Sequence, residues 1–405
     1  MNSAYLTGEK GAHLLGAMLL MVGVARLMGK GGFADYGFVI ALTALFVPVL
    51  DFGLNNRVIK AVASRGDQAK RATADAVGLK LVLAPPALAV MGLVGWAAGK
   101  SWEILAAVLL VGGSTVAMSL GDAVSSIFKG LQRPIFSALL VAGLNVLLLG
   151  TGVGAMGMGL GLLGIGVSYL VCRSLYFVLA MAVVGWIDPD LRPPLRPGIR
   201  RVQFAQGLQH LPAPYYLGNL LHLAYVATYL SVDVSVSAPF FIGYRLAAAL
   251  FILASAGQEA VLPALTERFG QVSGLGRALL RAFWAQLGIT LGAVGIVQVA
   301  ARPVTVWIFG DDYLPAVAAV RLLAWTAPPL VLSGLAHTAL LAMERQRAAS
   351  LAMLATLAGG TVTAALAVQI GGAQAGGLAP ALVGLVSAGV LWTAVWRTAR
   401  RTPAV

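Results

Sequence analysis

Twelve apolar stretches, each long enough to cross a lipid bilayer, run through this 405-residue chain. A membrane-spanning helix needs roughly 20 apolar residues. The stretches are continuous and do not alternate, which predicts helices, because a helix satisfies its own backbone hydrogen bonds in lipid. The predicted spans are residues 12–29, 36–56, 76–98, 103–125, 134–153, 160–186, 205–230, 238–262, 279–301, 314–342, 348–370 and 376–396. The sequence therefore predicts an all-α integral membrane protein with about twelve transmembrane helices in two six-helix bundles.

Composition and motifs argue against an enzyme. Only 11% of the residues are charged, against about a quarter in typical soluble proteins. The chain has no zinc-ligand spacing, no Walker A lysine and no nucleophile elbow, so neither a metal nor another cofactor is predicted. Residues 159–164 match the pattern G-x-G-x-x-G, but they open an apolar span with no preceding strand. Close helix packing explains those glycines better than a dinucleotide does.

The net charge of +13 raises the possibility of nucleic-acid binding, so the positions of the 28 Lys and Arg residues matter. If the N-terminus is cytoplasmic, 22 of them fall on inner segments and four on the outer side. This count assigns Lys80 and Arg173 to the inner side and leaves Arg245 and Arg321 within spans. The inner excess predicts that both termini are cytoplasmic, and it explains the charge without a nucleic-acid partner.

Prolines and arginines alternate between the sixth and seventh spans, which predicts a linker between two halves. The predicted domains are an N-terminal six-helix bundle at 1–190, a cytoplasmic linker at 191–202 and a C-terminal six-helix bundle at 203–405. Both halves have a long basic inner loop after their second span, as parallel repeats do. Chance similarity in an Ala- and Leu-rich chain accounts equally well for the few matching letters.

Charged residues within spans are the sharpest functional signal, because a charge at mid-membrane costs roughly 2.5–3.5 kcal/mol on insertion scales. Arg26, Arg245 and Arg321 lie toward the outer side and are candidates for binding an anionic substrate. Asp51 and Asp122 lie in the inner halves of spans two and four and are candidates for coupling or gating. Snorkelling explains Arg26 better than function does. For Arg321 and the two aspartates, a structural role and a functional one are equally supported.

The seventh span is polar for a membrane helix. His210 belongs to one polar stripe and Asn219 and His222 to another, and all three are candidate substrate-binding residues. Pro212 and Pro214 separate the stripes and should kink or break the helix. Interrupted helices in membrane proteins line cavities, so these prolines are candidates for gating.

Three parts of the chain resemble the multidrug/oligosaccharidyl-lipid/polysaccharide exporter (MOP) superfamily, and within it the flippases of lipid-linked polysaccharide repeat units. They are RLMGKGGFADYG (26–37) with DFGL (51–54), FIGYRL (241–246) running to VLPAL (261–265), and FGDDYLPA (309–316). This resemblance implies two bundles around a central cavity that opens alternately to each side, in the inner membrane of a bacterium.

The resemblance also implies a cargo, a polyprenyl-pyrophosphate-linked oligosaccharide that moves from the cytoplasmic to the outer leaflet. Arg245, with Arg26 or Arg321, would attract the pyrophosphate, polar side chains of the seventh span would bind sugar, and the isoprenoid tail would stay among membrane lipids. A polysaccharide polymerase and a chain-length regulator are the implied partners.

Two alternatives stay open. An ion-coupled exporter of small molecules or drugs belongs to the same superfamily, and Asp51 or Asp122 could serve it as proton sites. The drug-exporting branch usually depends on a carboxylate in span one or seven, which this chain lacks. A membrane-embedded polysaccharide polymerase is less favoured, because the outer loops are short.

Overall fold

The protein is helical, with short connections between its helices. The computed structural model describes residues 2–64, 68–198, 200, 204–205, 207–208, 211–231, 233–250, 272–343, 351, 353, 356 and 378–397, and no strand occurs among them. The chain forms two compact units, Met1–Leu211 (unit 1) and Pro212–Val405 (unit 2). The all-α fold predicted from the sequence is confirmed.

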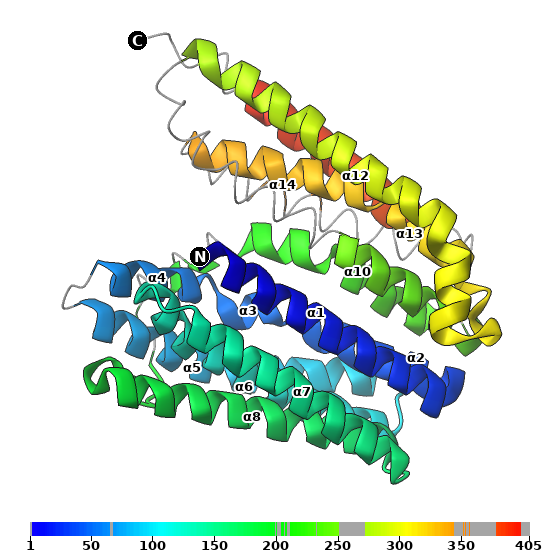
Figure 1. Cartoon of the computed structure of the whole chain (residues 1–405), viewed down its shortest axis with the longest axis horizontal. Helices are drawn as coiled ribbons and strands as arrows, with labels where there is room; N and C mark the ends of the chain where they lie inside the picture. The colour runs from blue at the N-terminus through cyan, green and yellow to red at the C-terminus, as the bar shows by residue number, and fades with distance from the viewer. Residues whose placement is uncertain are drawn as a thin grey trace. The chain divides into compact units, whose positions relative to one another are not determined.

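Unit 1 contains the six predicted spans of the first half, seen in Figure 1 from blue to green. They are α1 (Asn2–Leu27), α2 (Gly29–Ala44) continued by α3 (Val47–Asp51), α5 (Gln68–Ala97), α6 (Trp102–Gly130), α7 (Ile135–Gly157) and α8 (Gly161–Ile187). A short helix, α4 (Leu54–Ala63), follows α3, and a single 3-10 turn, η1 (Pro189–Leu191), follows α8.

The second predicted span, 36–56, is broken in the structure. Pro48 has no N–H to donate to the carbonyl of Ala44, and the helix is interrupted at this point, between α2 and α3. Phe52 and Gly53 then adopt left-handed conformations, with φ of 51° and 72°, which ends α3 and turns the chain into α4. The sequence predicts a loop after span 36–56, and the structure forms the helix α4 there.

Tight turns join α5 to α6, α6 to α7 and α7 to α8. In each turn one residue has a positive φ: Gly99 (65°), Gln132 (61°) and Gly159 (75°). The residue after it donates its N–H to a carbonyl in the last turn of the preceding helix, as in Arg133 to Phe128 at 2.8 Å. Gly159 belongs to the G-x-G-x-x-G match, so that motif forms a helix-to-helix turn.

Unit 2 has a similar set of elements. They are α10 (Pro212–Ser231), a helix at Val234–Leu250, α12 (Val272–Phe309), a 3-10 turn η2 (Asp311–Tyr313), α13 (Ala316–Ala324), α14 (Ala327–Ala342) and a helix at Leu378–Arg397. The break between α13 and α14 at Trp325 and Thr326 precedes Pro328 and Pro329, which cannot donate hydrogen bonds to the preceding turn. Most of the eleventh predicted span, 348–370, lies outside the described residues.

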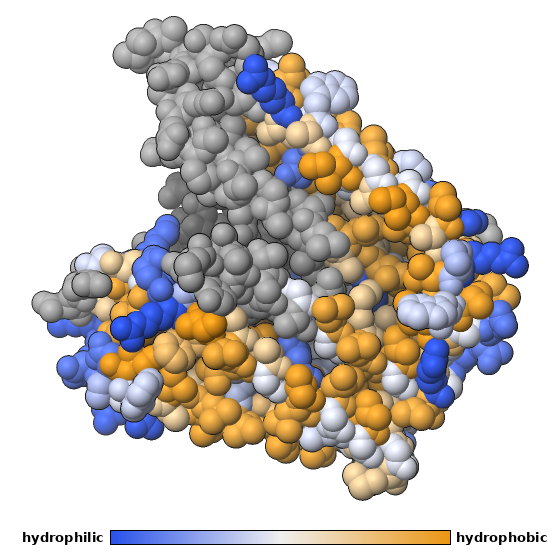
Figure 2. All heavy atoms as spheres, viewed as in Figure 1, coloured by the Kyte–Doolittle hydropathy of each residue, from blue (hydrophilic) through white to orange (hydrophobic). Residues whose placement is uncertain are grey.

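The lengths and surfaces of these helices fit a lipid bilayer. Eight helices in the described part of the chain are long and apolar enough to cross a membrane, and two shorter apolar helices accompany them. Apolar side chains cover much of the visible face in Figure 2, and hydrophilic ones gather near the η1 and α4 end of unit 1. Trp96, Trp102 and Trp186 are exposed near helix ends, where amphipathic rings favour the membrane interface. The chain is a multi-pass membrane protein.

Candidate functional site

A buried lysine lies at the centre of the candidate site in unit 1. Lys80, in the first half of α5, is 0% exposed. Its ammonium donates to Ser119 Oγ at 2.8 Å, to the Ser119 carbonyl at 2.9 Å and to Asn55 Oδ1 at 3.1 Å. Asp51 Oδ1 lies 3.5 Å from the same nitrogen. Because a buried charge is stable only when it is paired and hydrogen-bonded, Lys80 holds α3, α4 and α6 around itself.

Asp122 adds a second acidic group on α6. Tyr176 of α8 donates its hydroxyl to Asp122 Oδ1 at 3.1 Å. The Tyr176 ring packs directly on Gly121, where an added Cβ would lie 2.4 Å from a ring carbon. Asp122 lies one turn beyond Ser119 on α6, and Ser119 accepts a hydrogen bond from Lys80. The carboxylate therefore has a hydrogen-bond donor from α8 and lies one helical turn from the residue that binds the Lys80 ammonium.

Arg173 forms the other half of this buried network, midway along α8. Its Nη1 donates to Ser114 Oγ at 3.1 Å and lies 3.4 Å from Thr115 Oγ1. The guanidinium lies over the Tyr169 ring, 4.8 Å from the centroid, in a cation–π contact. The Tyr169 hydroxyl is 3.1 Å from that of Tyr36 on α2. The guanidinium thus joins α8 to α6 midway along α8.

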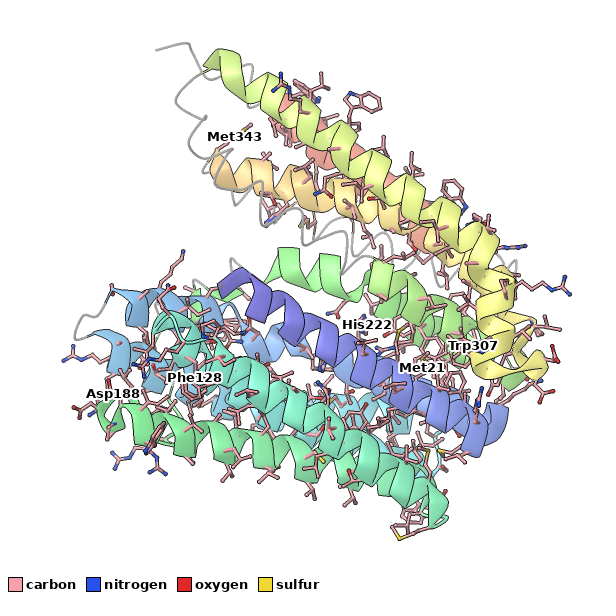
Figure 3. All side chains as sticks on the ribbon, in the orientation of Figure 1. Met21, Phe128, Asp188, His222, Trp307 and Met343 are labelled. Atoms are coloured by element: carbon pink, nitrogen blue, oxygen red, sulfur yellow. The ribbon has the colours of Figure 1, made fainter. Side chains whose placement is uncertain are left out.

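The residues that make these contacts lie in two stripes, one on α6 and one on α8. Each stripe has the i, i+4, i+7 spacing of residues on one helix face. We call them together the polar seam: Thr115, Ser119 and Asp122 on α6, and Tyr169, Arg173 and Tyr176 on α8. Lys80 joins the seam at Ser119. Figure 3 labels Phe128, which is fully buried farther along α6. Ionisable groups in such a position in a membrane bundle usually have a function.

The structure corrects the side of the membrane to which the sequence assigned two basic residues. The charge count assigned Lys80 and Arg173 to the inner side, whereas the structure places both within membrane helices. The sequence signal was available, because Arg173 is midway through predicted span 160–186 and Lys80 lies inside 76–98. Because each charge was assigned to its nearest loop, Lys80 and Arg173 were not recognised as residues within the membrane helices.

Both predicted coupling aspartates belong to this region. Asp51 pairs with Lys80 and keeps a third of its side chain exposed, whereas Asp122 is held from α8 by Tyr176. The structure thus brings together two residues that lie on different predicted spans. Their role in coupling stays a prediction.

The predicted binding residues of unit 2 lie near an aromatic cluster. His222 of α10, labelled in Figure 3, meets Tyr244 edge-on at 5.3 Å between ring centroids. Tyr244 also stacks on Tyr225 at 5.3 Å. Asn219 is 2% exposed, and Arg245 is half-buried next to Tyr244 in the helix Val234–Leu250. Rings from α10 and from the following helix therefore pack together next to His222.

The other predicted arginines are exposed. Arg26 lies in the last turn of α1, where a cation interacts favourably with the helix dipole. Arg321 on α13 donates from Nε to the Gln298 carbonyl at 3.0 Å and accepts from Gln298 Nε2 at 2.9 Å through its own carbonyl. Arg321 thus helps join α13 to α12. Its role in substrate binding, like that of Arg26, stays a prediction.

The remaining candidates lie at the start of α10. Pro212 is its first residue, so Pro212 and Pro214 occupy the first turn, where a missing N–H costs little. Leu211 forms a turn immediately before them. His210 lies outside the described residues. Within the described ranges, no group of three or more His, Cys, Asp or Glu residues could hold a metal ion.

Comparison with solved structures covers the whole chain. The inward-facing conformation of a multidrug resistance MATE family transporter of the MOP superfamily matches with a TM-score of 0.72 and 15% identity, over 96% of each chain. The fold is that of the MATE transporters. An outward-facing conformation of a transporter described in the same words matches with a TM-score of 0.64 and 14% identity, over 99% of this chain and 97% of that one.

A eukaryotic MATE transporter has a TM-score of 0.67 and 13% identity, over 99% of this chain and 98% of that one. No protein family and no curated protein matches the sequence. The MATE-like fold agrees with the superfamily predicted from three sequence segments, whereas the polysaccharide flippase branch within it stays a prediction.

Proposed function

We propose that this chain exports small organic molecules across a membrane by alternating access, and that proton movement in the polar seam drives it. Its fold is similar to solved MATE transporters in both inward-facing and outward-facing conformations, which supports alternating access. Those structures are of multidrug transporters, which supports a small-molecule cargo over a lipid-linked one. The observation that carries the coupling mechanism is the buried contact of Lys80 with Ser119 beside Asp122.

The polar seam can respond to a proton because the cations in and beside it are matched by carboxylates. The cations are Lys80 and Arg173, and the carboxylates are Asp51 and Asp122. With Asp122 ionised, Lys80 is close to two carboxylates, one of which it contacts directly. When Asp122 takes up a proton, Lys80 keeps only Asp51 as an anionic neighbour. Burial strengthens such interactions, since the effective dielectric constant is lower than in water. A change in the attraction between α5 and α6 would then accompany each proton bound.

Proteoliposomes loaded with fluorescent cationic, neutral and anionic dyes test this proposal. We expect an imposed pH gradient to drive efflux of at least one dye, and Asp122→Asn to reduce that efflux by at least tenfold. Asp190→Asn is the matched control, because Asp190 is in η1 and its side chain is 96% exposed. Efflux that is independent of the pH gradient, or equal in the two variants, would contradict proton coupling through the seam.

A second candidate is the flipping of a polyprenyl-pyrophosphate-linked oligosaccharide, with a polysaccharide polymerase and a chain-length regulator as partners. The observation that favours it is the pair of arginines within membrane helices, Arg173 and Arg245, which suits an anionic cargo. The same proteoliposomes distinguish the two candidates when they carry a fluorescent lipid-linked oligosaccharide in one leaflet. Movement of this lipid that depends on Arg245, without dye efflux, would favour the flippase.

A further inference from the structure

A cavity of ≈ 290 Å³ lies between α7 and α8 in unit 1. Leucines from both helices line it, and four of them have large exposed fractions: Leu139 (63%), Leu147 (39%), Leu175 (40%) and Leu179 (43%). Both helices are among those long and apolar enough to cross a membrane. The cavity is therefore a groove in an apolar surface whose solvent is lipid hydrocarbon.

The polar groups that line the groove are already bonded elsewhere. The Tyr176 hydroxyl donates to Asp122, and Cys172 Sγ lies 3.5 Å from Thr151 Oγ1. A water molecule in a buried site needs two to four polar partners, so this lining favours an apolar occupant. The volume is at the lower limit of about 300–1,000 Å³ typical of drug-sized ligands. Part of a hydrocarbon chain fits these properties better than a drug-sized cargo.

A glycine provides the space in the α7 wall. Gly143 lines the groove, and a Cβ built on it meets no atom within 4 Å. Glycine inside a helix costs about 0.5–1 kcal/mol relative to alanine. Leu140 and Leu144, on either side of it along the chain, also line the groove, so Gly143 opens a notch between two leucines.

We propose that this groove binds one acyl chain of a membrane phospholipid. The chain would lie in the notch at Gly143, against the leucines of α7 and α8, and contact Tyr176. The occupancy of this site does not depend on what the protein transports. Through Tyr176 the bound chain is one residue from Asp122.

Photo-crosslinking in liposomes tests the site. The purified chain is reconstituted in phosphatidylglycerol and phosphatidylethanolamine that carry a diazirine in one acyl chain, and adducts are located by mass spectrometry. We expect groove residues to carry several-fold more adduct than exposed leucines elsewhere on the two helices. Gly143→Leu should reduce the groove adducts several-fold, because its side chain fills the notch.

Gly150→Leu is the matched control, since Gly150 is also on α7, does not line the groove and has no atom within 4 Å of an added Cβ. It should leave the groove adducts unchanged. Gly143→Ala fills less space and should reduce them only in part, which keeps the test decisive if the leucine variant misfolds.

Even labelling over all exposed apolar positions, or equal groove labelling in the Gly143 and Gly150 variants, would overturn the proposal. Displacement of the label by a polyprenyl phosphate, but not by extra unlabelled phospholipid, would assign the groove to another lipid and also overturn it. None of these outcomes depends on dye efflux, so the proposed transport function is tested separately.

Discussion

Among the described residues, a fully buried charged side chain occurs in unit 1 and none occurs in unit 2. Lys80 is enclosed among the helices of unit 1, and the half-buried Arg173 lies over the Tyr169 ring. Unit 2 buries rings, with Tyr225 and Tyr244 both 0% exposed and stacked on each other. Both units are built from apolar helices, so the difference lies in what the helices enclose.

This difference indicates a division of labour. Buried ions are stable only while their partners stay in place, so protonation of one group changes the packing of its neighbours. Stacked rings gain stability from buried area and ring geometry, which do not change between pH 5 and 8. We therefore expect proton-dependent changes mainly in unit 1 and expect packing to dominate in unit 2.

The largest effect is expected from Lys80→Met. Removing the ammonium leaves Asp51 and Ser119 without their cationic partner, and breaking a buried pair costs about 3–5 kcal/mol. The lower part of this range applies, because a third of the Asp51 side chain is exposed. Thermal unfolding in detergent, followed by the loss of monodisperse protein, measures the effect.

Two comparisons sharpen this prediction. Lys60→Met changes an exposed lysine of α4 and should stay within about 0.5 kcal/mol of the wild type. Adding Asp51→Asn to Lys80→Met should recover part of the loss, since it removes the carboxylate that was left alone. A single Lys80→Met variant as stable as wild type would show that unit 1 does not depend on its buried ions.

Gly243→Ala should have the next largest effect and tests packing in unit 2. An added Cβ at Gly243 would lie 2.7 Å from the Ala319 carbonyl carbon, so two backbones must separate. Overpacking of this kind costs about 1–3 kcal/mol. Gly292→Ala on α12 is the control, because its Cβ meets no atom within 4 Å and alanine is the better helix former. Equal thermal stability of the two variants would contradict the close contact.

Gly121→Ala should destabilise less than Gly243→Ala but should change the pH dependence of transport. Its Cβ would meet a side-chain ring, that of Tyr176, which can move where a backbone cannot. Movement of the ring removes the hydrogen bond to Asp122. Efflux measured from pH 5 to 8 should therefore shift relative to the wild type. Gly113→Ala, whose Cβ has its nearest neighbour at 3.5 Å, should leave the pH profile unchanged.

Much of the fold followed from hydropathy alone, because lipid forces each span to be a continuous apolar helix. The helices break before Pro48 and before Pro328, where N–H donors are missing, and the sequence predicts the second of these breaks. Pro85 and Pro86 lie inside α5 without breaking it, so a proline alone does not fix where a helix ends. The helix α4 was missed because its apolar residues Leu54, Val58 and Val62 lie in a segment rich in basic residues.

The candidate site was harder to predict. A single sequence shows that Arg173 is inside an apolar run but not that it faces Ser114 on a helix more than fifty residues away. Pairing between helices depends on how they rotate against one another, which hydropathy does not set. The stripes Thr115–Ser119–Asp122 and Tyr169–Arg173–Tyr176 were visible as spacing, whereas their contact with each other required the structure.

The smallest effect is expected at an arginine that the sequence placed in the substrate site. Arg321 is exposed and bonds to the carbonyl of Gln298, so Arg321→Gln should cost no more than about 1 kcal/mol of stability.

Arg173→Gln, in contrast, removes a guanidinium that contacts three side chains, those of Ser114, Thr115 and Tyr169, and should reduce dye efflux strongly. Side-by-side efflux of the two variants compares an exposed cation of unit 2 with a half-buried one of unit 1. We expect Arg321→Gln to stay within about twofold of the wild type, since a solvated side chain already bonded to a helix neighbour contributes little. A tenfold loss in Arg321→Gln would instead support the predicted role of Arg321 in substrate binding and would show that transport does not depend on the polar seam alone.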